Sequence, residues 1–171
     1  MIAIIARAIA QLRRARRGAA ALEFALVFPV FLVFAGMIME NGMLLVDQAF
    51  LDYATADAGR LIRIGQVQQG SGETAFTSQL CADVHPLISC GSLQFNVQSA
   101  SNPGFGSLNA TVAADRYGNL ATTSFTPGGP GDDVLVQVAY KRSLLFTWIS
   151  STAMSLVFST SAFQNEKYSG P

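Results

Sequence analysis

The stretch Arg13–Glu40, RRARRGAAALEFALVFPVFLVFAGMIME, decides the fold of this chain. It places a block of arginines, a glycine, one glutamate and a long apolar run in that order. Phe24 to Met39 carries no charge and would form roughly 24 Å of helix at 1.5 Å per residue. Ala19 to Val46 would form roughly 42 Å, more than the ~30 Å hydrocarbon core of a bilayer. The stretch therefore predicts one membrane-spanning helix.

Charge predicts the orientation of this span. The arginines that set the orientation precede the apolar run, and they are Arg13, Arg14, Arg16 and Arg17. No acidic residue precedes Glu23. Because basic residues favour the cytoplasmic side, we expect a cytoplasmic N-terminus and an outer C-terminal part, periplasmic on a bacterial inner membrane. The membrane explains this cluster better than nucleic acid does. A secretory signal cleaved after Ala35 is the alternative, which the continuing apolar run disfavours.

The helical pattern continues beyond the apolar run. From Ala19 to Gln69 the residues favour helix, with a kink expected at Pro29. Beyond Val46 the pattern becomes amphipathic, and apolar residues recur at three- and four-residue steps: Leu51, Ala54, Ala58, Leu61 and Ile62. Glycines near residues 65–72 supply the stop signal. We expect one long helix over 19–69.

The remainder alternates between apolar and polar residues, which is typical of strands. The clearest strands are predicted over 93–98, 134–141 and 156–163, with a weaker one over 121–126. A firm turn signal occupies 127–132, and 143–154 is read as a short helix or a packed loop. A second span over 143–163 is disfavoured because this segment is rich in Ser and Thr. The predicted class is α+β, with a helix leading into a small antiparallel sheet.

This pattern divides the chain into three segments. Residues 1–18 form a basic leader, 19–69 the membrane helix and its amphipathic extension, and 70–171 an outer α+β domain. The outer domain holds both cysteines, Cys81 and Cys90, for which an oxidising compartment favours a disulfide. Two separate buried thiols are the alternative.

Chemistry-bearing residues are few. His85 is the single histidine, so no metal site is expected, and no cofactor motif occurs. Ser89, His85 and Asp83 lie close together in sequence, but they lie around a predicted disulfide and lack a nucleophile-elbow motif. We therefore expect no enzyme and no small-molecule substrate.

Glu23 is the unusual residue of the apolar segment. A carboxylate within a membrane helix costs roughly 2.5–3.5 kcal/mol on insertion scales. One interpretation places Glu23 at the inner membrane edge, where it stays hydrated. The other starts from Gly18-Ala19-Ala20-Ala21-Leu22-Glu23-Phe24, which resembles the site cut by type IV prepilin peptidase. That resemblance implies cleavage between Gly18 and Ala19 and a pairing of Glu23 with an N-terminal amine of a neighbouring subunit.

The wider sequence resembles the TadE/TadG-like proteins of the tight-adherence (Flp) pilus system. The resemblance rests on Arg17-Gly18-Ala19-Ala20-Ala21, Glu23-Phe24-Ala25-Leu26, Pro29, Gly36, Glu40 and Gly42, and on Ala54, Ala58, Gly59 and Arg60. The ending Asn165-Glu166-Lys167-Tyr168 is similar to the usual Asn-Glu-Pro-Tyr of that family, with Lys167 in place of the proline. The chain length is similar to TadE rather than to the longer TadG.

This resemblance implies a pseudopilin, a minor pilin-like and non-enzymatic subunit of the bacterial inner membrane. Its helix would pack against other pilins through Glu23, Phe24, Pro29 and Glu40, and its partners would be the Tad secretion machinery and prepilin peptidase. For Glu40 two interpretations stay open, a hydrated carboxylate at the outer interface or a pair with a partner helix. The alternative function is a single-span envelope protein whose periplasmic domain binds a ligand or partner unrelated to pili.

Overall fold

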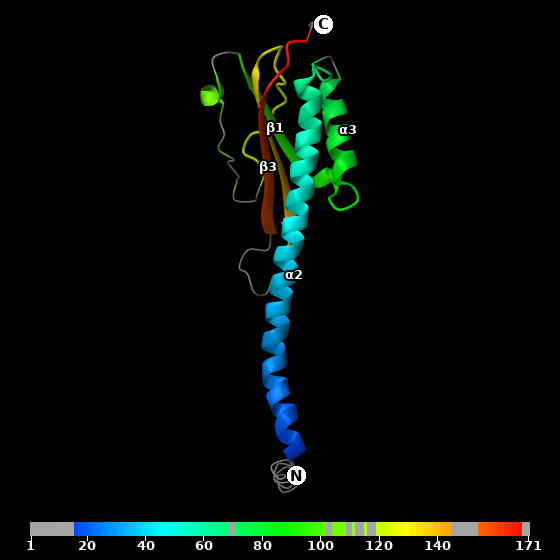
Figure 1. Ribbon diagram of the computed structural model, residues 1–171, viewed down its shortest axis with the longest axis vertical. Helices are drawn as coiled ribbons and strands as arrows, with labels where there is room; N and C mark the ends of the chain where they lie inside the picture. The colour runs from blue at the N-terminus through cyan, green and yellow to red at the C-terminus, as the bar shows by residue number, and fades with distance from the viewer. Residues whose placement is uncertain are drawn as a thin grey trace. The chain divides into compact units, whose positions relative to one another are not determined.

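The computed structural model describes residues 16–68, 71–101, 104–108, 111, 115, 119–144 and 154–168 (Figure 1). Packing divides the chain into two compact units, Met1–Asn41 (unit 1) and Gly42–Pro171 (unit 2). The predicted leader, 1–18, lies largely outside the described residues, as do Arg13 and Arg14. The three-segment division 1–18, 19–69 and 70–171 follows function rather than packing and stays a prediction.

Helix α2 spans Arg16–Arg63 and contributes to both units. It continues through Pro29, which lies inside the apolar run. In unit 1 the large apolar side chains of this run are mostly exposed, whereas Gly36 and Glu40 are buried. In unit 2 the same helix buries one face, because Leu51, Ala54, Ala58 and Ile62 recur on a single side.

The chain reverses after α2 and forms a second helix. Gly65 adopts a positive φ of 82°, and its amide donates to the Ile62 carbonyl at 3.1 Å, which ends α2. Helix α3 then spans Gly72–Val84 and buries Phe76, Leu80 and Val84. In unit 2, Figure 1 shows α3 beside the later part of α2.

The sheet of unit 2 has three antiparallel strands in the order β1-β2-β3. These are β1 (Leu93–Ala100), β2 (Asp133–Ser143) and β3 (Met154–Gln164). The register pairs Val97 with Val136 and Tyr140 with Val157. Side chains two apart share a face, so the valines of β2 meet the helices with those of the two outer strands.

The core of unit 2 lies between this face and the two helices. It joins apolar residues from all five elements, and Phe76 of α3 packs edge-on against Phe95 of β1 with ring centroids 5.4 Å apart. Phe125 completes an aromatic cluster, with its ring centroid 5.6 Å from that of Phe76. This burial of large apolar side chains from every element is the main stabilising term of unit 2.

The opposite face of the sheet buries polar groups together with Leu135 and Ala139, and the segment that precedes β2 bonds to it. Asn96 and Gln137 are buried there, with Asn96 Nδ2 donating to Gln137 Oε1 at 3.2 Å. The Ser124 hydroxyl donates to Asn96 Oδ1 at 2.7 Å. Because these buried polar side chains form hydrogen bonds with one another, the free-energy cost of removing them from water is small.

The structure confirms the α+β class and the three clear strands. It also corrects three details. The long helix ends at Arg63 rather than Gln69, and α3 was not predicted. Segment 121–126 makes only a single bridge, between Phe125 and Val97. The alternative of a second span over 143–163 is wrong, because Met154–Gln164 is a strand; the short helix or loop expected over 143–154 lies largely outside the described residues.

Candidate functional site

The candidate processing site lies in the first turn of α2. Helix α2 is described from Arg16, and it contains the Gly18–Ala19 bond, which follows Arg17. Glu23 follows little more than one turn later, and its side chain is exposed. The structure therefore places Gly18, Ala19 and Glu23 on one helix, and the role of Gly18–Ala19 as a cleavage site stays a prediction.

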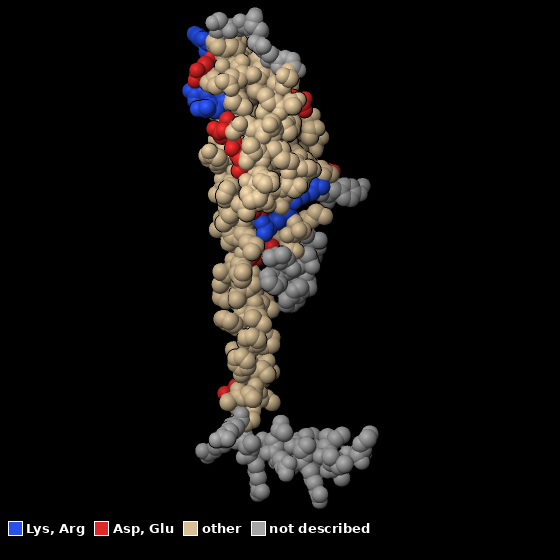
Figure 2. All heavy atoms as spheres, turned by 90° about the vertical axis from the view of Figure 1, so that its right-hand side faces the viewer, with Lys and Arg blue, Asp and Glu red and all other residues tan. Residues whose placement is uncertain are grey.

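The segment after Glu23 is a helix with no buried apolar face. The large side chains between Leu22 and Met39 are mostly 40–69% exposed, Phe24 and Phe34 at 63%. Phe24 stacks on Phe28 with ring centroids 4.8 Å apart, which ties neighbouring turns together. Figure 2 shows this part of α2 as uncharged apart from one acidic group near the inner end. An apolar surface of this extent indicates a lipid or protein environment.

By length and composition this helix is a candidate membrane span, and it is the single candidate among the described residues. Its residues carry two acidic groups within the apolar part, Glu23 and Glu40. They differ in environment, since Glu23 is exposed whereas Glu40 is only 9% exposed. The helix therefore presents Glu23, and not Glu40, on its accessible surface. The predicted roles of Glu23, Phe24, Pro29 and Glu40 in subunit packing stay predictions.

Unit 2 begins with an ion pair that the sequence did not predict. The Arg142 guanidinium at the end of β2 donates to the Asp47 carboxylate on α2, and the two side chains are 17% and 5% exposed. The same guanidinium lies 3.3 Å from the sulfur of Met43. A charge pair removed from water in this way fixes the end of β2 against α2. No local signal joins these residues, which are separated by 95 positions.

The C-terminal signature residues close the other end of unit 2. Asn165 Nδ2 donates to the carbonyls of Pro127 and Gly129 at 2.9 and 3.0 Å, and so fastens the turn before β2. The Glu166 amide donates to the Arg63 carbonyl, and its carboxylate pairs with the Arg63 side chain at 3.4 Å. We call Asn165–Tyr168 the C-terminal clasp, because it joins the last turn of α2 to the sheet.

Tyr168 completes the clasp by covering Gly65. A Cβ at Gly65 would meet the Tyr168 ring at 2.7 Å, so this contact requires glycine as well as a positive φ. Burial raises the pKa of the Tyr168 phenol above its ordinary value, and the negative charge of Asp132 adds to this effect. The side chain of Gln68 opposes the shift in part. The clasp therefore favours a neutral phenol.

Cys81 and Cys90 form the predicted disulfide. It joins α3 to the short 3-10 helix η1 (Cys90–Ser92) that leads into β1. Near it, Asp83 accepts a hydrogen bond from Gln79 Nε2 at 3.2 Å. Among the described residues no group of His, Cys, Asp and Glu is arranged to hold a metal ion.

Comparison with known proteins identifies a family for the long helix α2. Residues 18–60 match the model of the TadE-like protein family. The predicted resemblance is therefore confirmed for the helix from Gly18 to Arg60. No curated protein and no solved structure matches the chain.

The TadE-like segment begins at the predicted cleavage site and ends in the buried part of α2, so it includes the span and its outer extension. It indicates a component associated with the Tad pilus and with a membrane. The C-terminal clasp lies outside the matched residues, so its likeness to the family ending stays a resemblance. The clasp also shows what the ending does here, since it fastens the turn of α2 that follows the TadE-like segment.

Proposed function

We propose that this protein is a pseudopilin of a Tad (Flp) pilus, a non-enzymatic subunit that packs against other pilin-like subunits through the first part of α2. One observation supports this most: the first half of the segment that matches TadE-like proteins, as far as Met39, is a helix whose large apolar side chains are mostly exposed and whose one acidic group, Glu23, is accessible. A surface of that kind is suited to lateral association within a membrane.

The proposed mechanism starts with removal of the leader. Prepilin peptidase cuts the Gly18–Ala19 bond on the cytoplasmic face, and Ala19 becomes the new amino terminus. Its free amine then lies close to the depth of Glu23, and the ammonium of one subunit pairs with the carboxylate of the next. Because an unpaired carboxylate in an apolar setting is costly, this pair selects one register among apolar helices that otherwise slide freely.

The same proposal assigns the compartments. Arg13, Arg14, Arg16 and Arg17 keep the N-terminus in the cytoplasm, and unit 2 lies in the periplasm, anchored to the inner membrane. The disulfide between Cys81 and Cys90 supports an oxidising compartment for unit 2. The direct partners are other pilins or pseudopilins and the Tad secretion machinery.

The test compares two glutamine variants in cells that assemble the pilus. Glu23→Gln removes the proposed pairing charge, and Glu73→Gln, which neutralises an exposed carboxylate on α3, is the matched control. We expect Glu23→Gln to reduce pilus number and co-purification with other pilins while the protein level is unchanged. Normal pili in the Glu23→Gln strain would contradict the role of the pair.

A second candidate is an envelope protein with one span whose outer domain binds a ligand or partner unrelated to pili. The observation that favours it is the position of the family match, which ends at Arg60 and leaves α3 and the sheet unassigned. In that case deletion of the gene leaves pilus assembly intact, and both glutamine variants behave as the natural protein.

A further inference from the structure

Six large apolar side chains are exposed at one end of unit 2. They come from two elements, α2 and β3, and Leu45 at 71%, Met154 at 54% and Phe158 at 49% are the most exposed. We call them the apolar collar: Met43, Leu45, Val46, Phe50, Met154 and Phe158. None of them is needed for the core between the helices and the sheet.

Contacts within unit 2 place both parts of the collar at the same end of the unit. The Arg142–Asp47 pair holds the end of β2 against α2, and Arg142 is paired with Ser155, next to Met154. Gln48 Nε2 donates to the Phe158 carbonyl at 2.9 Å. The collar residues therefore lie at one end of unit 2, with four on α2 and with Met154 and Phe158 on the face of β3 that points away from α2.

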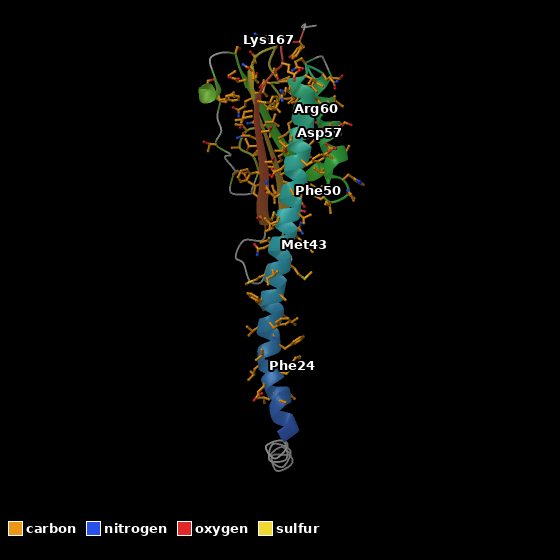
Figure 3. The ribbon with its side chains drawn as sticks, viewed as in Figure 1. Phe24, Met43, Phe50, Asp57, Arg60 and Lys167 are labelled. Atoms are coloured by element: carbon orange, nitrogen blue, oxygen red, sulfur yellow. A yellow bond between two sulfur atoms is a disulfide. The ribbon has the colours of Figure 1, made fainter. Side chains whose placement is uncertain are left out.

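Charge changes sharply along α2 at the edge of this region. Between Asn41 and Leu51 the one charged residue is Asp47, which is buried and paired with Arg142. Exposed charges begin at Asp52 and continue with Arg60 and Arg63. Figure 3 shows Met43 and Phe50 on the stretch of α2 before Asp57 and Arg60. Along α2, unit 2 thus has no exposed charge near Gly42 and several beyond Leu51, whereas on the sheet Lys141 and Arg142 are partly exposed at the end of β2.

The chain itself limits how far the collar lies from the bilayer. Leu22 to Asn41 forms about 30 Å of helix, which is the thickness of the hydrocarbon core. Val46 follows Asn41 by five residues, which is about 7.5 Å along a helix and at most roughly 18 Å in any conformation. Whatever the angle of the span, this end of unit 2 stays at the membrane surface.

We propose that the apolar collar lies in the headgroup layer of the outer leaflet, so that unit 2 rests partly immersed in the membrane. The inference rests on the membrane anchoring of the proposed function. Tyr53 then lies at the water boundary, where aromatic rings with a polar end are favoured, and the Asp47–Arg142 pair meets the need for paired charges near lipid.

The spread of the collar favours lipid over a second copy of the chain. Successive helical residues are separated by 100°, so Leu45 and Phe50 lie about 140° apart on α2, and Phe158 lies on a different element. A partner helix covers one stripe, whereas a membrane surface contacts apolar groups on every side of the entering helix. Immersion also explains why the exposed charges of α2 begin only at Asp52.

The experiment places a nitroxide label on single cysteines in the full-length protein in phospholipid bilayers. The described chain has no free cysteine, because Cys81 and Cys90 are joined. Phe158→Cys and Val46→Cys test the collar at two elements. Ser78→Cys is the matched control, exposed on α3 beside Gln79, which bonds to Asp57 at 2.9 Å. Collision rates with oxygen, which enters lipid, and with a water-soluble nickel chelate are compared by power saturation.

We expect oxygen to relax the labels at positions 158 and 46 several-fold more than the nickel chelate does, and the reverse at position 78. Nickel access at 158 and 46 equal to that at 78 would overturn the proposal. Low access to both reagents together with dipolar broadening would also overturn it, and would assign the collar to a second copy. Alkaline carbonate extraction of the same membranes distinguishes failure of the membrane anchoring from failure of the collar proposal. Release of the protein refutes the anchoring. Retained protein with nickel-accessible labels refutes only the immersion of the collar.

Discussion

At the residue scale, the Asp47–Arg142 pair is the clearest case of a charge that is stable only with its partner. Asp47→Asn leaves a guanidinium that is 17% exposed without its counterion. We expect this variant to lose on the order of 3 kcal/mol of unfolding free energy. The measurement is urea unfolding of the full chain in detergent, followed by near-ultraviolet circular dichroism.

The matched control replaces both partners. Asp47→Leu combined with Arg142→Met removes the two charges together and leaves neither unpaired, so most of the lost stability returns. A double variant as unstable as Asp47→Asn would show that the contact acts through shape rather than charge.

Tyr168 gives a prediction in pH. Its pKa in the folded chain is raised above the unfolded value of 10.0, because the charged phenolate is disfavoured by burial and by Asp132. This contribution to stability is fully present below that value and is lost as pH rises through the folded pKa. We expect the natural chain to lose more thermal stability than Tyr168→Phe between about pH 9 and about pH 11. Equal losses in the two proteins would refute a buried phenol in the clasp.

At the scale of elements, the C-terminal clasp is predicted to hold the end of α2. Asn165→Ala removes two hydrogen bonds and leaves the carbonyls of Pro127 and Gly129 without their donor, which costs about 2 kcal/mol. Hydrogen exchange should become faster in residues 60–68 and in the turn 127–132. The matched control is Gln164→Ala, which removes a single exposed bond to Gly131 and leaves exchange unchanged. Equal exchange in both variants would contradict the clasp.

The elements that the sequence predicts well are those with local signals. The β2 alternation and the turn from Pro127 to Asp132 appear where expected, because side-chain periodicity and glycine placement act over a few residues. Helix α3 was missed although Phe76, Leu80 and Val84 have helical spacing. The glycines near residues 65–72 predict the end of the long helix, and they give no sign that Gly72 begins the next helix.

Long-range contacts could not be predicted in the same way. Asp47 meets Arg142 and Arg63 meets Glu166 because the sheet and α2 pack together, and neither pair has a signature in the sequence. Of the candidate site, Gly18, Glu23 and the apolar run were located from the sequence alone, since their order along one helix is itself the signal. The apolar collar could not be predicted from the sequence, because Met154 and Phe158 reach this end of unit 2 only through the pairing of β3 with β2.

At the scale of the whole molecule, the TadE-like segment has two tasks in one helix. In unit 1 its large apolar side chains are mostly exposed, which the proposal assigns to contact with lipid and other subunits, and in unit 2 it buries Leu51, Ala54 and Ile62 beneath the sheet. The proposed pseudopilin role depends on the first task, and the stability of the outer fold depends on the second. Variants in unit 2 should therefore change folding, whereas Glu23→Gln should change assembly without unfolding the protein.

The most direct measurement of the pseudopilin proposal is the intact mass of the protein isolated from cells with an active prepilin peptidase. The account predicts a mature chain that begins at Ala19 and lacks residues 1–18, and a Gly18→Val variant that keeps them. Full-length protein alone in those cells would contradict it, because Glu23 would then have no free amine at Ala19 to meet.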